Sequence, residues 1–335
     1  MKYFVIALAA SALTSAQTPV ISIRPNMSPG LTGASSAMAG ARMGMPVLGY
    51  VAGPGALDLH IIMGTSRAAQ MGGSVAVPSG AKQLFVPPRA LYVLLESKAN
   101  EPLAIWTPLN ASSDAVPLPA AVAAHPDSIA FSARGDAAVL YSRSGDRLQV
   151  VTGLPAEPHV SAQAGIAQWG PLKSLAVSDD GEAVSASLAD GTAVVSLRGS
   201  TWQRLPAAYN ARVVSFVPHT HNLVVSDTAQ QTLLLIGNVA LPTQTTRIVA
   251  YNVAADRLAF TKEGGVLLAA SSSQNKVWTL DLSTMTLGPV SSASSIDTLL
   301  PLRDGHTFLL SATGVALLKV PVENDNAAGF VAVTY

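Results

Sequence analysis

The feature that most constrains this chain is an internal repeat of 46 residues. Aligned without gaps at that offset, Ser128–Ser132 lie over Ser174–Ser178, and Gly135 and Gly145 lie over Gly181 and Gly191. Each copy contains three short apolar runs, separated by turns that carry glycine. Repeats of this length with about four short strands each are typical of a β-propeller, in which every repeat forms one blade.

The first turns of the repeats recur at a regular spacing, which measures the repeat length. We place these turns at Arg89, Gly135, Gly181, Thr220, Gly264 and Gly305, in steps of 46, 46, 39, 44 and 41 residues. Asp-Gly pairs suit such tight turns, because glycine adopts positive φ angles at little cost. The runs between the turns are continuously apolar, as expected where neighbouring blades cover both faces. Helical repeats of similar length would show a 3.6-residue spacing instead.

Six turns predict an all-β propeller of six blades. Fainter fourth strands are expected near residues 115–118, 158–162, 201–205, 239–246 and 286–290. We expect the strand-like residues 48–63 to pair with the C-terminal strands and so close the last blade, because an open ring would leave strand edges unpaired. If residues 330–334 add a further strand and both strands of residues 48–63 join it, seven blades become the alternative.

The N-terminus reads as an export signal followed by a linker. Residues 1–16 combine a basic start, an apolar stretch and small residues, which predicts a signal peptide cleaved after Ala16; a buried first helix is the alternative. Residues 17–46, rich in Pro, Gly, Ala and Ser, predict a flexible linker or an arm on the domain surface. Residues 47–335 then form the propeller. We expect a periplasmic, secreted or cell-surface protein without a transmembrane span, since no other stretch approaches ~18 apolar residues.

The composition excludes several classes of function. The 20 basic and 20 acidic residues give a net charge of zero and form no block of either sign. Nothing therefore matches the basic surface of a nucleic-acid binder. The chain has no cysteine, which rules out disulfides, thiolate metal sites and a cysteine nucleophile.

The repeats resemble those of secreted bacterial β-propellers of the YVTN/WD40-like type, above all at Ser174–Gly181, and the resemblance covers residues 47–335. It implies the propeller fold but little about function, because such propellers host enzymes, binders and scaffolds alike. The sequence lacks the Gly-His…Trp-Asp combination of WD40 repeats, a Gly-Gly pair recurring once per blade as in kelch repeats, and the sialidase Ser-x-Asp-x-Gly-x-Thr-Trp box. No sub-family is identified, and no family active-site residue is carried over.

The sequence assembles no catalytic or metal-ligating group. His219 and His221 are the only close histidine pair, and they fall in a predicted turn, so we interpret them as polar turn residues rather than a metal site. Residues 72–76 lack the final glycine of a nucleophile elbow and read as a loop. Asp179 and Asp180 fall at a turn, where carboxylates serve the backbone geometry. We predict no catalytic residue, no metal and no cofactor.

One set of residues recurs at the repeat spacing. Trp169, Tyr209 and Tyr251 each precede an expected innermost strand, and amides and cations follow them. Loops that enter the innermost strands converge around the channel of a propeller. The predicted ligand-binding residues are Trp169, Lys173, Tyr209, Asn210, Arg212, Tyr251 and Asn252, and Arg257 follows at a similar place in the next repeat. The alternative is that the aromatic rings cap the core between blades.

These observations favour a monomeric, non-enzymatic binding or scaffold module. Its loop face around the channel would take a protein, a peptide or a small polar ligand. The alternative is a lactonase-like propeller hydrolase with a divalent metal held by carboxylates. Only the family resemblance supports this alternative.

Overall fold

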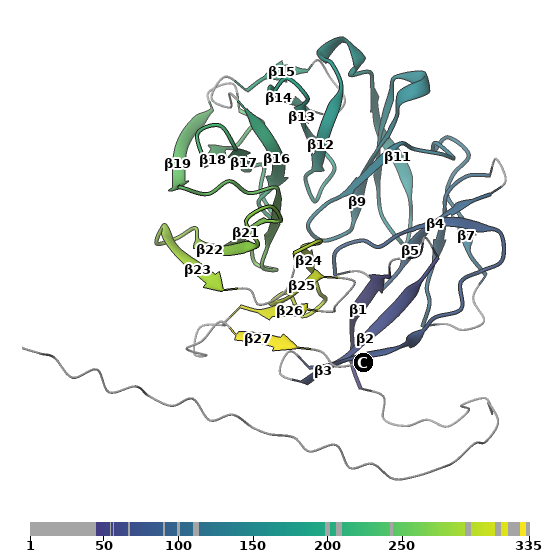
Figure 1. The fold of residues 1–335 in the computed structure, drawn as a ribbon. Coiled ribbons are helices and arrows are strands. Elements are labelled where there is room, and N and C mark those ends of the chain that lie inside the picture. Colours follow the sequence, from purple (N-terminus) through teal and green to yellow (C-terminus); the bar gives the residue numbers. More distant parts are fainter. Residues whose placement is uncertain are drawn as a thin grey trace, which may run out of the picture. The chain divides into compact units, whose positions relative to one another are not determined.

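The computed structural model shows a ring of seven antiparallel sheets in the part of the chain that it describes (Figure 1). The description covers residues 45–335 except 54, 56, 66–67, 90, 99–100, 110–113, 198–201, 206–209, 242–243, 292–295, 312–315, 321–328 and 333–335. The predicted signal peptide and nearly all of the predicted linker lie outside these residues, so export stays a prediction. Within them, no helix is long and apolar enough to cross a membrane.

Each sheet is one blade, formed by strands that follow one another in the sequence. Blade 1 comprises β1 (Val47–Ala52), β2 (Leu59–Thr65) and β3 (Ala68–Ser74). Blade 2 comprises β4 (Ala81–Phe85), β5 (Val93–Ser97), β6 (Ala104–Trp106) and β7 (Val116–Pro117). Blade 3 comprises β8 (Ser128–Phe131), β9 (Ala137–Ser142), β10 (Arg147–Thr152) and β11 (His159–Ala164). Blade 4 comprises β12 (Leu172–Val177), β13 (Ala183–Leu188), β14 (Ala193–Leu197) and β15 (Gln203–Arg204).

The remaining blades repeat this order. Blade 5 comprises β16 (Ala211–Phe216), β17 (Leu223–Asp227), β18 (Thr232–Gly237) and β19 (Thr245–Tyr251). Blade 6 comprises β20 (Arg257–Phe260), β21 (Val266–Ser271), β22 (Lys276–Asp281) and β23 (Thr286–Ser291). Blade 7 comprises β24 (Leu300–Pro301), β25 (Thr307–Ser311), β26 (Ala316–Lys319) and β27 (Gly329–Ala332). Two short 3₁₀ helices, η1 (Arg143–Gly145) and η2 (Ala167–Trp169), lie in connections.

The prediction of six blades is wrong, and the alternative of seven is confirmed. The sequence prediction missed β3, whose residues Ala-Ala-Gln-Met-Gly-Gly-Ser have weak strand propensity and had read partly as a loop. With β3, the N-terminal strands form a blade of their own. The last blade obtains its fourth strand from β27, close to the terminal run that had been considered for this role.

The predicted closure, in which N- and C-terminal strands share one sheet, is also wrong. Within the described residues, no strand of blade 1 pairs with a strand of blade 7. The ring closes instead through side-chain packing and a backbone hydrogen bond between the two blades. Leu302 of blade 7 is buried against Leu48 and Ile62 of blade 1, and the Arg303 amide donates a 2.7 Å hydrogen bond to the Leu48 carbonyl oxygen.

The core consists of seven hydrophobic clusters, and each cluster joins two neighbouring blades. Alternate residues of one strand therefore belong to different clusters. In β18, Leu233 packs toward blade 6 while Leu234 packs toward blade 4. Because both faces of a blade are buried, its middle strands are continuously apolar, as the sequence analysis had expected.

The first turns bring neighbouring blades into close approach. Gly181 has φ +73°, and a Cβ atom there would lie 2.2 Å from Cγ2 of Thr152 in blade 3. The equivalent turn of blade 5 lacks glycine, and His219 takes the left-handed conformation with φ 61°. Thr220 nevertheless holds the turn position of Gly181, because its amide donates to the Val217 carbonyl as the Gly181 amide donates to the Ser178 carbonyl. The predicted turn position at Thr220 is therefore confirmed.

We expect Gly181→Ala to destabilise the protein by about 2 kcal/mol, because it adds backbone strain at positive φ and overlap with Thr152. Urea unfolding measures the change. Gly265→Ala is the matched control, since a Cβ atom at Gly265 meets nothing within 4 Å. Equal losses in the two variants would contradict the role of the close approach.

Candidate functional site

The innermost strands enclose a cavity of about 600 Å³ at the centre of the ring. Residues of β8, β12, β16 and β20 form most of its wall. These four strands all run in the same direction along the channel. Each begins at the connection that enters its blade and ends at the first turn of that blade. The cavity therefore has an entry end, where these strands begin, and a first-turn end.

Three cations gather at the entry end. Lys173 is the second residue of β12, Arg212 is the second residue of β16, and Arg257 opens β20, so neighbouring blades supply one cation each. All three line the cavity. Within the described residues, none of the three side chains forms an ion pair or a hydrogen bond. The Nε atom of Arg257 is buried without a partner. A cluster of uncompensated donors is what an anionic ligand requires.

One acidic residue, Asp256, stands among the described residues that line the cavity. Its carboxylate accepts hydrogen bonds from the Ser272 hydroxyl and, at 3.3 Å, from the Ser272 amide. Asp256 is thus held by the loop of its own blade. The three cations and this one carboxylate leave a formal charge of two positive units at the entry end.

Arg89, in the first turn of blade 2, crosses the other end of the channel. One guanidinium nitrogen donates a 2.7 Å hydrogen bond to the Ala133 carbonyl of blade 3, and the other donates to the Phe260 carbonyl of blade 6. Its backbone amide donates to Pro301 of blade 7 at 3.1 Å. Blades 2 and 6 are not neighbours in a seven-bladed ring, so the bond to Phe260 spans the axis.

Burial lowers the pKa of this arginine but does not remove its charge at neutral pH. Removal from water lowers the pKa of Arg89 to about 10, although Asp179, Asp304 and Glu263 act in the opposite direction. The side chain therefore stays protonated at neutral pH. Pro88, Ala133 and Pro301 line this end of the cavity, which Arg89 crosses, and we call it the floor.

The structure separates the residues that the sequence analysis had grouped into one site. Lys173 and Arg212 lie together in the cavity. Trp169, in η2, packs against the cluster between blades 3 and 4, as the alternative interpretation had expected. Tyr251 ends the outermost strand β19 and is 64% exposed, so its ring lies at the periphery of blade 5.

The two predicted asparagines lie in loops that their backbones help to hold. The backbone amide of Asn210 donates to Asp227 Oδ2 at 3.2 Å, and the backbone carbonyl of Asn210 accepts from the Thr228 amide. Asn252 adopts φ 59°, a left-handed conformation that asparagine tolerates. Tyr209 lies outside the described residues. The sequence analysis noted Arg257 a few residues after Tyr251 and Asn252 but did not include it among the predicted ligand-binding residues.

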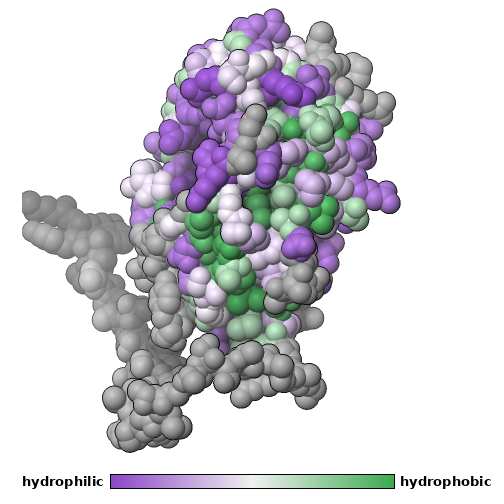
Figure 2. Space-filling view, turned by 90° about the vertical axis from the view of Figure 1, so that its right-hand side faces the viewer, coloured by the Kyte–Doolittle hydropathy of each residue, from purple (hydrophilic) through white to green (hydrophobic). Residues whose placement is uncertain are grey.

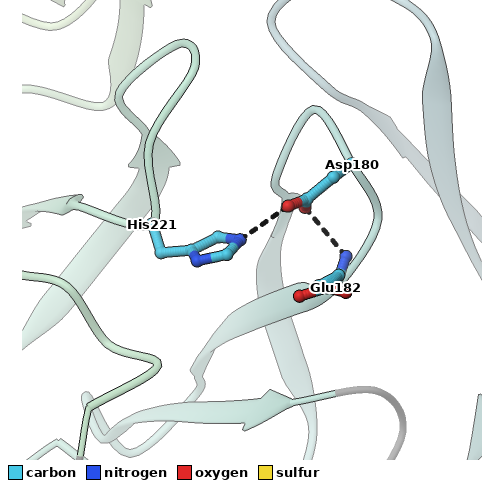
Figure 3. A group of neighbouring side chains, drawn as sticks. All are labelled: Asp180, Glu182 and His221. Atoms are coloured by element: carbon cyan, nitrogen blue, oxygen red, sulfur yellow. Dashed lines mark hydrogen bonds and ion pairs between the residues drawn. The ribbon is translucent and has the colours of Figure 1, made fainter.

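The carboxylates in the first turn of blade 4, Asp179 and Asp180, bind to the first turns of blades 3 and 5. Asp179 accepts hydrogen bonds from the amides of Arg134 and His219, in the turns of blades 3 and 5, at 3.0 and 2.9 Å. Asp180 faces His221, whose Nε2 atom lies 2.8 Å from Asp180 Oδ2 (Figure 3). These contacts tie three successive turns together, which the sequence could not show because the partners are about 40 residues apart.

Asp180, Glu182 and His221 could in principle hold a divalent cation, because one ligand atom of each lies within 4.8 Å of the others. The Asp180 carboxylate is already engaged, however, by the Ser178 hydroxyl, the Glu182 amide and His221. Burial raises the pKa of Asp180, but these hydrogen bonds outweigh it and lower the pKa overall. We therefore assign the group to bracing of the turns.

A further hollow of about 410 Å³ lies on the flank of blade 2. It is mainly apolar, and the exposed Val116 of β7 lies in the same blade; Figure 2 shows hydrophobic side chains across this side of the molecule. The buried Glu96 lines the hollow, but Lys82 Nζ and His125 Nδ1 each lie 2.7 Å from its Oε1 atom. Its charge is therefore compensated, unlike the charges in the channel.

No protein-family model matches the sequence, and no curated protein matches it. Among solved structures, the chain is similar to hydrazine synthase from Kuenenia stuttgartiensis, with 14% identity and a TM-score of 0.51 over 90% of this chain and 99% of that one. It is also similar to the β-propeller domain of Cps50 (Swd1) from Myceliophteria thermophila, with 14% identity and a TM-score of 0.44 over 63% and 70%. A functionally unknown protein from Desulfotomaculum acetoxidans has 13% identity and a TM-score of 0.48 over 74% and 78%. At these identities the likeness concerns the fold alone.

Proposed function

We propose that this β-propeller is a binding module that takes an anionic ligand in its central channel. The observation that carries the proposal is the set of three cations, Lys173, Arg212 and Arg257, that line one cavity without ion-pair partners among the described residues. Cations in a protein are usually compensated by carboxylates or fully solvated. Three that converge on a concave surface favour an anion as the missing partner.

The surroundings strengthen the attraction. The cavity walls exclude part of the solvent, so a charge inside interacts more strongly than it would at an open surface. Two of the cations are arginines, whose guanidinium groups form paired hydrogen bonds with carboxylate or phosphate oxygens. The ring also holds the three side chains on neighbouring strands of a rigid scaffold, which limits the ordering cost of binding.

We expect the natural protein to bind citrate or inorganic phosphate in isothermal titration calorimetry, and single substitutions in the channel to weaken binding. Lys173→Ala, Arg212→Ala or Arg257→Ala should each reduce affinity about 10-fold, since each removes one charge-assisted contact. The triple variant should show no measurable binding. Affinity should fall as the salt concentration rises, because the attraction is electrostatic.

Arg204→Ala and Lys276→Ala provide matched controls. Both cations are exposed on strands away from the channel, and their loss should leave affinity unchanged. Circular dichroism checks that every variant keeps its strand content. The proposal fails if neither anion binds, or if the control variants weaken binding as much as the channel variants do.

A further inference from the structure

The channel carries a second, independent property besides its charge, namely apolar side chains left partly open to the cavity. Phe131 of β8, Val213 of β16 and Leu258 of β20 line it, and all three are only half-buried although they lie at the centre of the ring. Apolar surface that faces water in a concave site gains about 25 cal/mol per Å² when a ligand covers it. A purely inorganic anion cannot provide that cover.

The two properties are arranged along the axis. In β12 the exposed Lys173 comes first, while Leu175 and Val177, farther along the strand, are buried. In β16 the exposed Arg212 likewise precedes the buried Phe216. The charged side chains of these two strands therefore lie at the entry end of the cavity.

The floor offers fewer free donors than the entry end. Both terminal nitrogens of Arg89 donate to carbonyl oxygens, and its Nε atom is buried without a partner. Pro88 and Pro301, which line the same end, have no amide hydrogen to donate. Arg89 therefore has one unengaged donor there, against three cations without ion-pair partners at the entry end.

From these observations we infer that the ligand is an amphipathic organic acid, with its anionic group at the Lys173, Arg212 and Arg257 end and its apolar body toward Arg89. The inference rests on the proposed function, because it concerns the same channel. The cavity of about 600 Å³ lies within the range of pockets for small organic molecules. The orientation follows from the cations, since three without ion-pair partners line the entry end, whereas both terminal nitrogens of Arg89 are already engaged.

The test compares acetate, octanoate and inorganic phosphate as titrants of the natural protein. Octanoate should bind at least about 30-fold more tightly than acetate, because its extra methylene groups cover Val213 and Leu258. Val213→Thr, which keeps the shape of the side chain, should weaken octanoate about 3-fold and leave phosphate unchanged. The channel variant Arg212→Ala should weaken both.

The outcomes separate the two proposals. If phosphate binds through the three cations but octanoate binds no better than acetate, the amphipathic ligand is wrong and the anion-binding channel stands. If neither octanoate nor phosphate binds, the proposed function itself fails. An octanoate affinity that Val213→Thr leaves unchanged would place the apolar chain outside the channel and also overturn the inference.

Discussion

Replacing Arg89 by methionine should destabilise the folded protein by about 3 kcal/mol, because two carbonyl oxygens in different blades lose their charged donors. The side chain joins blade 2 to Ala133 of blade 3 and to Phe260 of blade 6. Methionine fills a similar volume, so the loss reports mainly the hydrogen bonds that cross the channel. Equilibrium unfolding in urea measures the change, and the slope of the transition shows whether the folded state stays compact.

Arg134→Met is the matched control. Arg134 also lies in a first turn, but its side chain pairs with Asp136 in an exposed ion pair, and such pairs contribute about 0–1 kcal/mol. Arg89→Met should therefore be clearly more destabilising. Similar losses in the two variants would show that Arg89 does not hold the blades together.

Leu302→Ala should destabilise the protein by about 3 kcal/mol, because it opens a cavity in the cluster that closes the ring. Leu302 is 1% exposed and packs against Leu48 and Val51 of blade 1. Since blades 1 and 7 share no strand among the described residues, this packing and the bond from Arg303 to Leu48 carry much of the closure. Urea unfolding again measures the loss.

Leu241→Ala tests whether the loss comes from that position. Leu241 is 51% exposed in blade 5, and its truncation should change stability by less than about 0.5 kcal/mol. Hydrogen exchange adds a second criterion: β1 and β24 should lose protection in Leu302→Ala before β13 does, since the weakened contact lies between blades 1 and 7. A uniform loss around the ring would contradict closure through this contact.

Much of the fold could be predicted because each blade is local in sequence. The turns at Gly135, Gly181, Gly264 and Gly305 marked four blades correctly, since a left-handed turn residue leaves a sequence signature. Thr220 marked blade 5 correctly as well, although the left-handed residue of that turn is the preceding His219. Blade 1 was not recognised as a repeat, because its first connection, from Gly53 to Asp58, is not a short Asp-Gly turn.

The candidate site was predicted only in part. Lys173 and Arg212 were recognised through their recurrence after aromatic residues, but they line the channel because they begin innermost strands. The aromatic residues gave a misleading signal: Trp169 belongs to the core between blades, and Tyr251 ends an outermost strand. Each connection between blades leads from the outermost strand of one blade to the innermost strand of the next. The spacing of residues in the sequence does not show at which of these two ends a side chain lies.

The sequence by itself determined that this chain forms a ring of β-meanders, because hydrophobic period and turn chemistry act over a few residues. It also indicated the strands on which two of the channel cations lie. Only the tertiary structure decided the number of blades, the closure by Leu302 and the crossing of the channel by Arg89. Those features join residues as far apart in the chain as Leu48 and Arg303, and such contacts depend on how blades stack rather than on any local pattern.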